Sequence, residues 1–117
     1  MYTKKKIERA AEKADWSCII TDVDPKTHGA KYEISFQRFT ERGQDSNFEF
    51  SVSLLEDISM EVYNAWEGYD PDEAAYLWLG PDGHGKNGAP YYAEDVLADA
   101  KEVDEYLKKL FLELDRI

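Results

Sequence analysis

The sequence predicts an α+β domain in which an N-terminal helix precedes a three-stranded antiparallel meander, and two to three helices then pack on one sheet face (αβββααα). Three observations support this order. Apolar residues recur at helical spacing towards both ends of the chain, and they alternate with polar residues in the middle. Clusters of Gly, Pro, Asp and Asn separate these segments. A chain of 117 residues fits one domain, which we expect to cover residues 1–117.

The first 30 residues predict a helix, a strand and a turn. Residues 4–14 place four apolar side chains on one side of a helix: Ile7, Ala10, Ala11 and Ala14. Residues 16–23 are apolar and β-branched enough for a strand. The segment DPKTHG that follows, residues 24–29, has the composition of a turn.

The middle of the chain alternates strictly between apolar and polar residues. The apolar positions are Tyr32, Ile34 and Phe36, then Phe48, Phe50, Val52 and Leu54. A period of two predicts strands with one buried and one solvated face, as in antiparallel sheets. The short links at residues 24–29 and 41–46 suit two consecutive hairpins, so the three strands should form a meander.

The C-terminal half predicts helices. Leu55, Ile58, Val62 and Trp66 recur at spacings of three and four, and Gly68 is a plausible stop. Asp70 then suits the N-cap of a short helix that has Pro71 at its first position and ends at Gly80-Pro81. A last helix over residues 92–115 carries six regularly spaced apolar residues: Val96, Ala100, Val103, Leu107, Leu110 and Leu114.

The net charge of −11 is the most unusual property of the chain. Basic residues crowd the first segment, whereas no Lys or Arg lies between Arg42 and Lys86. An acidic surface repels phosphate backbones, which disfavours direct nucleic-acid binding. The same surface attracts a basic groove on a partner protein, although it could also serve solubility alone. The candidate partner-binding carboxylates are Glu56, Asp57, Glu61, Glu67, Asp70, Asp72, Glu73, Glu94, Asp95 and Asp99.

Aromatic residues are interspersed with these carboxylates. We expect Trp66 and Trp78 to anchor their helices against the sheet, because Trp66 lies on the apolar stripe of its helix. Tyr69 and Tyr76 lie where the acidic residues are densest, and Tyr69 lies off the apolar stripes, so both are candidate partner-binding residues. The long C-terminal helix could also support a homodimer.

No motif predicts catalysis, a cofactor or a metal. GPDGHGKN, residues 80–87, follows the phosphate-loop pattern but lacks its final Ser or Thr and its strand–loop–helix context. His28 and His84 each lie near Asp residues without the spacing of a zinc site. Cys18 lies in an apolar strand, where a buried thiol is unreactive.

The chain has no apolar run long enough to span a membrane and no secretory leader pattern. Its single cysteine cannot form an internal disulfide, which agrees with a reducing compartment. We therefore expect a cytoplasmic protein.

The C-terminal 50 residues resemble those of small acidic proteins of Firmicutes phages and mobile elements. The resemblance lies in Tyr69-Asp70-x-Asp72-Glu73, Trp78, Gly85-Lys86-Asn87-Gly88-x-Pro90 and the Asp95…Asp99 start of the last helix. In architecture and charge, the chain is also similar to anti-CRISPR proteins that imitate DNA and occupy the groove of Cas9 that reads the protospacer-adjacent motif.

This similarity implies an inhibitory protein that binds a Cas9–guide RNA complex or a related defence nuclease. An alternative is an acidic accessory protein of a phage or mobile element whose partner is not a nuclease. An enzyme is the third possibility, and it would require a pocket with converging, pKa-shifted groups.

Overall fold

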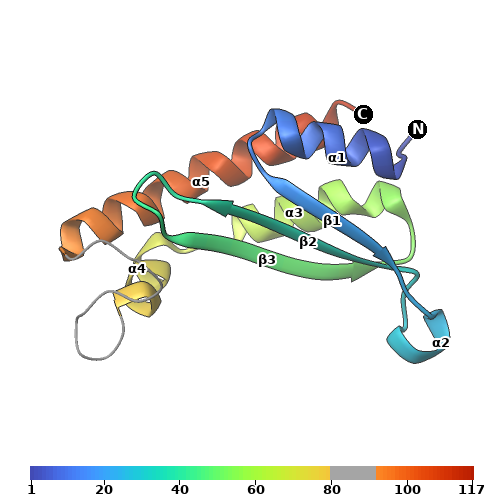
Figure 1. Ribbon diagram of the computed structural model, residues 1–117, viewed down its shortest axis with the longest axis horizontal. Coiled ribbons are helices and arrows are strands. Elements are labelled where there is room, and N and C mark those ends of the chain that lie inside the picture. Colours follow the sequence, from blue (N-terminus) through green and yellow to red (C-terminus); the bar gives the residue numbers. More distant parts are fainter. Residues whose placement is uncertain (80–91) are drawn as a thin grey trace.

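A computed structural model describes residues 1–79 and 92–117, and its elements follow the predicted αβββααα order (Figure 1). Their bounds are α1 (Lys4–Lys13), β1 (Ser17–Asp22), α2 (Pro25–His28), β2 (Tyr32–Phe39), β3 (Asp45–Val52), the 3-10 turn η1 (Leu55–Asp57), α3 (Ile58–Glu67), α4 (Pro71–Leu79) and α5 (Ala93–Asp115). The α+β fold is therefore confirmed, with the one-turn helix α2 added between the first two strands.

The three strands form an antiparallel meander in the order β1-β2-β3. Its inner face consists of three rows across the strands: Cys18–Phe36–Phe48, Ile20–Ile34–Phe50 and Asp22–Tyr32–Val52. The outer face presents mainly Ser, Thr, Gln, Asn and Glu, with Ile19 as an exposed exception. The alternation in the sequence therefore identified the buried face correctly.

The core lies between the inner face of the sheet and the helices α1, α3 and α5, which cover that face (Figure 1). Within the sheet, the ring of Phe36 stacks on those of Phe48 and Phe50, at centroid distances of 5.3 and 6.0 Å. The helices contribute Ile7, Ala10, Ala11 and Ala14 from α1, Ile58 and Val62 from α3, and Val103, Leu107, Leu110 and Leu114 from α5.

Helix α1 is fixed to α5 at both ends. The Tyr2 hydroxyl donates to the Leu114 carbonyl (3.1 Å), and the Trp16 indole N–H donates to the Tyr106 carbonyl (3.0 Å). The apolar stripe of α5 is buried by these neighbours inside the chain. A second copy would therefore have to use another face of α5.

Helix α3 packs on α5 through Trp66. Its indole N–H donates to Asp104 Oδ1 (3.1 Å), and its ring stacks on Phe111 with the centroids 6.2 Å apart. These contacts join α3 to α5, and Trp66 also packs against the core cluster that includes the sheet residues Ile34 and Phe36, as predicted. Helix α4 packs on the first half of α5, where Ala75, Val96 and Ala100 form a second, smaller buried cluster.

Three local predictions need correction. Residues 24–29 form a helical turn, because Asp24 Oδ1 accepts the Lys26 N–H (3.0 Å) and Pro25 starts α2, which Gly29 ends at φ 70°. Leu54 lies beyond β3 and is exposed, since the strand ends at Val52. The helix expected from Leu55 begins as a 3-10 turn and becomes α-helical at Ile58.

The last helix begins at Ala93, within one residue of its predicted start. The Gly80-Pro81 end of α4 and the Gly-rich segment lie outside the described residues. No helix within residues 1–79 and 92–117 is both long and apolar enough to cross a bilayer.

Candidate functional site

Helix α3 and the turn before it point a row of carboxylates away from the core. Ile58 and Val62 are fully buried, so the opposite side of the helix faces solvent. Glu56, Asp57 and Glu67 are exposed, and Glu61 is half-buried. Met60 lies among them with 58% of its surface exposed. Met60 was not predicted to lie on the surface, although its position away from the buried stripe of Ile58 and Val62 indicates that it is exposed.

Helix α4 continues the acidic surface. Asp70 is its N-cap: Asp70 Oδ1 accepts the Asp72 N–H (3.0 Å), which satisfies one of the free amides at the helix start. Asp72 and Glu73 lie exposed in the first turn, where the helix dipole favours negative charge. Further along the helix, Tyr76 and Leu77 are 67% and 61% exposed. Two large apolar side chains therefore lie beside two carboxylates.

We call these residues the α3–α4 acidic surface: Glu56, Asp57, Glu61, Glu67, Asp70, Asp72 and Glu73, with Met60, Tyr76 and Leu77. Within the described residues, none of its carboxylates takes part in an ion pair. Their charge is thus uncompensated locally, and it is available to a basic partner.

The spacing of these charges can be compared with that of DNA. Four carboxylates lie between residues 56 and 67, a stretch of about 17 Å at the helical rise, which gives one charge per about 4 Å. One strand of B-DNA carries a phosphate per about 3.4 Å of axis, and the duplex carries one per about 1.7 Å. Two of these carboxylates belong to the turn η1 and two to α3, so the comparison applies to residues 56–67 as a whole. Their linear charge density is closer to that of a single strand than to that of a duplex.

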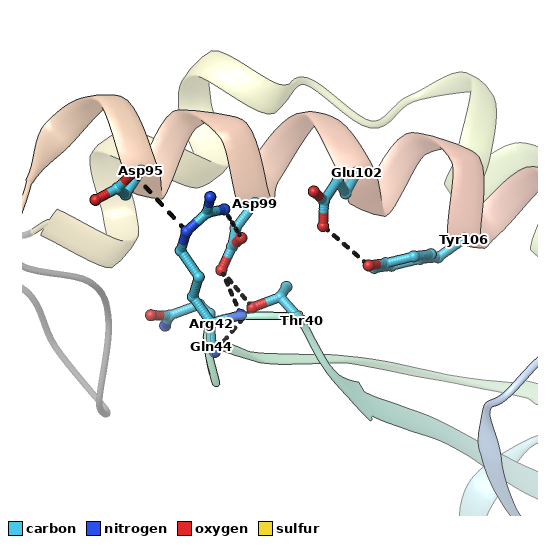
Figure 2. A network of polar contacts seen from close by, with 7 residues as sticks. All are labelled: Thr40, Arg42, Gln44, Asp95, Asp99, Glu102 and Tyr106. Atoms are coloured by element: carbon cyan, nitrogen blue, oxygen red, sulfur yellow. Dashed lines mark hydrogen bonds and ion pairs between the residues drawn. The ribbon is translucent and has the colours of Figure 1, made fainter.

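The carboxylates of α5 are used within the protein, which corrects part of the predicted site. Asp99 is fully buried, with no exposed surface. Figure 2 shows its contacts with the β2–β3 hairpin: Oδ2 accepts from Thr40 Oγ1 (2.7 Å) and the Arg42 N–H (3.3 Å), and Oδ1 from Arg42 Nη1 (2.9 Å). Asp99 therefore cannot be a partner-binding residue while this fold is intact.

The neighbours of Asp99 have a related role. Asp95 Oδ1 lies 3.8 Å from Arg42 Nε, so the same cation neutralises part of its charge. The Asp99 carboxylate raises the pKa of Arg42, chiefly through their hydrogen bond. Glu94 is exposed at the start of α5 and stays a candidate partner-binding residue. The helical pattern carried a signal for this difference, because Asp99 lies beside the apolar stripe, three residues after Val96, whereas Glu94 lies on the opposite side of the helix. The pattern could not show that a hairpin distant in the sequence covers Asp99.

Tyr69 also has a structural role. Its hydroxyl donates to the Ala100 carbonyl (2.7 Å), and burial raises the pKa of the phenol. Since its polar end is engaged within the chain, Tyr69 belongs to the junction of α3, α4 and α5. Tyr76 is the predicted aromatic residue that remains exposed on the surface.

The groups considered for catalysis do not come together. Burial raises the pKa of the Cys18 thiol to about 12, so almost no thiolate forms at neutral pH. His28 Nδ1 lies 3.7 Å from Glu33 on an exposed part of the chain. Among residues 1–79 and 92–117, no three His, Cys, Asp or Glu side chains are placed to hold a metal ion. His84 and the phosphate-loop pattern lie outside these ranges.

Comparison of the chain with family models, curated proteins and solved structures gives no match. The function is therefore inferred from the residues of the site alone.

Proposed function

We propose that this protein is an acidic inhibitor that binds a basic groove of a partner protein through its α3–α4 acidic surface. The observation that supports this most is the combination of seven carboxylates, without ion pairs in the described part of the chain, and the exposed side chains of Met60, Tyr76 and Leu77. Solubility alone would account for the charges but would not require three exposed large apolar residues beside them.

The two kinds of side chain have different tasks in such an interface. Carboxylates at the rim of an interface accelerate encounter with a positively charged partner and select against acidic partners. Buried apolar and aromatic anchors supply most of the binding free energy. Tyr76 and Leu77 are adjacent on α4, one turn after Glu73, so one helix face carries both functions.

The partner that best suits this chemistry is a protein whose groove binds nucleic acid. A groove that binds a phosphate backbone carries Lys and Arg at short spacing, and the linear charge density of residues 56–67 is close to that of one strand. We propose a defence nuclease as the partner, with the Cas9–guide RNA complex as the leading candidate, because Cas9 reads its protospacer-adjacent motif with arginines. The protein would then be of the anti-CRISPR type and prevent target DNA from binding.

A second candidate is an acidic accessory protein that binds a partner other than a nuclease. Met60, Tyr76 and Leu77 support it equally, because exposed apolar anchors serve an interface with any protein partner. The two candidates differ in whether nucleic acid competes with this protein for the partner.

The test is a DNA-cleavage assay in which the protein is titrated into guide-loaded Cas9 from several Firmicutes hosts before target DNA is added. The informative variant, E67Q/D72N/E73Q, removes three exposed charges and retains the Asp70 cap. The control variant, E33Q/E41Q/E49Q, removes three exposed charges outside the α3–α4 acidic surface, so both variants carry the same net charge.

We expect dose-dependent loss of cleavage that E67Q/D72N/E73Q weakens at least tenfold and that the control variant retains. Equal loss of inhibition in the two variants would show that inhibition depends on net charge alone, and this would contradict a defined binding surface. Full cleavage with every Cas9 tested, and no complex on a sizing column, would contradict Cas9 as the partner. If a complex forms and DNA does not compete with this protein for the partner, the result would favour the second candidate, the accessory protein.

A further inference from the structure

Two hollows are lined by the C-terminal half of α5, which runs beside α1 in Figure 1. Helix α1 lines the other side of the first hollow, whereas Asp15 and Arg38 of β2 line the other side of the second. The first, of about 400 Å³, is lined by Lys6, Arg9, Ala10, Lys13, Glu113, Arg116 and Ile117. The second, of about 420 Å³, is lined by Asp15, Arg38, Glu105, Tyr106, Lys108, Lys109 and Leu112. Because both are lined by the C-terminal half of α5, we call them together the α1–α5 groove.

The α1–α5 groove is basic although the protein is acidic. It contains seven of the chain's fourteen Lys and Arg residues and only three carboxylates. Two of these carboxylates are already neutralised: Glu113 Oε1 lies 2.9 Å from Arg116 Nη1, and Asp15 Oδ2 lies 3.8 Å from Lys109 Nζ. A net positive groove within a chain of net charge −11 means that the charges are segregated over the surface.

The three α1 cations of the groove are not explained by the packing of the fold, whereas Arg38, Lys109 and Arg116 already have partners within the chain. Lys6, Arg9 and Lys13 are exposed along one edge of α1, while Ile7 and Ala11 face the core. Within residues 1–79 and 92–117, none of the three forms an ion pair. Crowding several unpaired cations costs stability, and a bound polyanion would relieve that repulsion.

We propose that the α1–α5 groove binds the phosphate backbone of a short single-stranded nucleic acid. The cations on its two sides supply phosphate contacts over residues 105–117 of α5, a length of about 18 Å at the helical rise. At one end, the Arg38 guanidinium lies 3.5 Å from the centroid of the Tyr106 ring. Guanidinium planes and aromatic rings are the groups on which unpaired bases stack.

The acidic surroundings favour a single strand over a duplex. A duplex would bring a second row of phosphates over the neighbouring acidic helices and meet repulsion there. The net charge also weakens long-range attraction, so binding should be modest and strongly dependent on salt.

The groove and the α3–α4 acidic surface are lined by different residues, so this inference can fail or hold independently of the proposed function. If both hold, the protein would engage a nucleoprotein through two surfaces, with its carboxylates on the protein and its cations on the nucleic acid.

Fluorescence anisotropy with a labelled ten-nucleotide oligouridylate, titrated with the full chain between 20 and 150 mM salt, tests the inference. The informative variant is K6Q/R9Q/K13Q. The control is K26Q/K31Q/K101Q, which removes three exposed lysines outside the groove and gives the same net charge. Ten-residue polyglutamate serves as a competitor, and thermal melting checks that both variants fold.

With about four net contacts, log K should fall against log salt with a slope of about −3, since single strands release about 0.7 counterion per phosphate. K6Q/R9Q/K13Q should weaken binding at least tenfold and reduce the magnitude of that slope by about two. The control variant should leave both the affinity and the salt slope unchanged. Absence of binding at 20 mM salt, equal losses in the two variants, or displacement by polyglutamate at equal concentration would each overturn the inference.

Discussion

At the scale of single residues, burial distinguishes carboxylates that were predicted to have the same role. Asp99 has no exposed surface and accepts three hydrogen bonds from the β2–β3 hairpin, whereas Glu73 is exposed on α4. A buried carboxylate must be hydrogen-bonded, because leaving it unpaired would cost far more than any contact gains. Asp99 therefore holds the hairpin against α5, and Glu73 is available to a partner.

We predict that Asp99→Ala lowers the free energy of unfolding by about 3 kcal/mol, because it leaves Thr40 and Arg42 without their shared acceptor. Urea denaturation monitored by tryptophan fluorescence measures this. The control is Asp95→Ala, whose half-exposed carboxylate is 3.8 Å from Arg42; its cost should stay below about 1 kcal/mol. Equal costs for the two variants would contradict a special role for Asp99.

At the scale of elements, the same local signal starts two very different helices. Asp24-Pro25 begins α2 and Asp70-Pro71 begins α4, and in both cases the Asp side chain accepts the N–H two residues on. Gly29, at φ 70°, ends α2 after one turn with no residue buried. Helix α4 continues for nine residues because Ala75 packs into the cluster with Val96 and Ala100. Tertiary packing, not the cap, decides the length of the helix.

We predict that Asp70→Ala destabilises the protein by about 1 kcal/mol through loss of the N-cap, and that Asp70→Asn, which keeps an accepting oxygen, has little effect. Thermal and urea unfolding of the two variants test this. If Asp70→Asn were as costly as Asp70→Ala, the charge of Asp70 and not its cap would be the stabilising feature.

At the scale of the whole molecule, the buried residues fall into two clusters of unequal size. The main cluster joins the sheet to α1, α3 and the second half of α5, while the smaller one joins α4 to the first half of α5 through Ala75, Val96 and Ala100. Small side chains bury little apolar area, so α4 is held less strongly than β2. The proposed binding surface therefore includes α4, which is held less strongly than the rest of the fold.

We predict that backbone amides of α4 exchange with deuterium at least tenfold faster than those of β2, because local opening of α4 exposes the smaller cluster and, of the side chains packed on the main cluster, only Trp78. Hydrogen–deuterium exchange followed by mass spectrometry measures this at peptide resolution. Equal protection of α4 and β2 would mean that both clusters open in one cooperative step.

The distribution of charge is also a property of the whole molecule. The total of −11 favoured a basic protein partner and disfavoured nucleic acid. Half of the cations nevertheless lie along the α1–α5 groove, where Lys6, Arg9 and Lys13 come to lie beside Arg116 of the last helix. A total charge cannot reveal such a groove, because it carries no information on which distant segments become neighbours.

The sequence by itself determined the order of elements, the inner face of the sheet and the apolar stripes of the helices. These follow from periods of 2 and 3.6 residues, which are local properties of the backbone. Only the tertiary structure decided that Asp99 and Tyr69 form hydrogen bonds within the chain, that Leu77 is exposed, and that cations of α1 lie beside Arg116. Each of these outcomes depends on contacts between segments far apart in the chain, and local periodicity does not encode them.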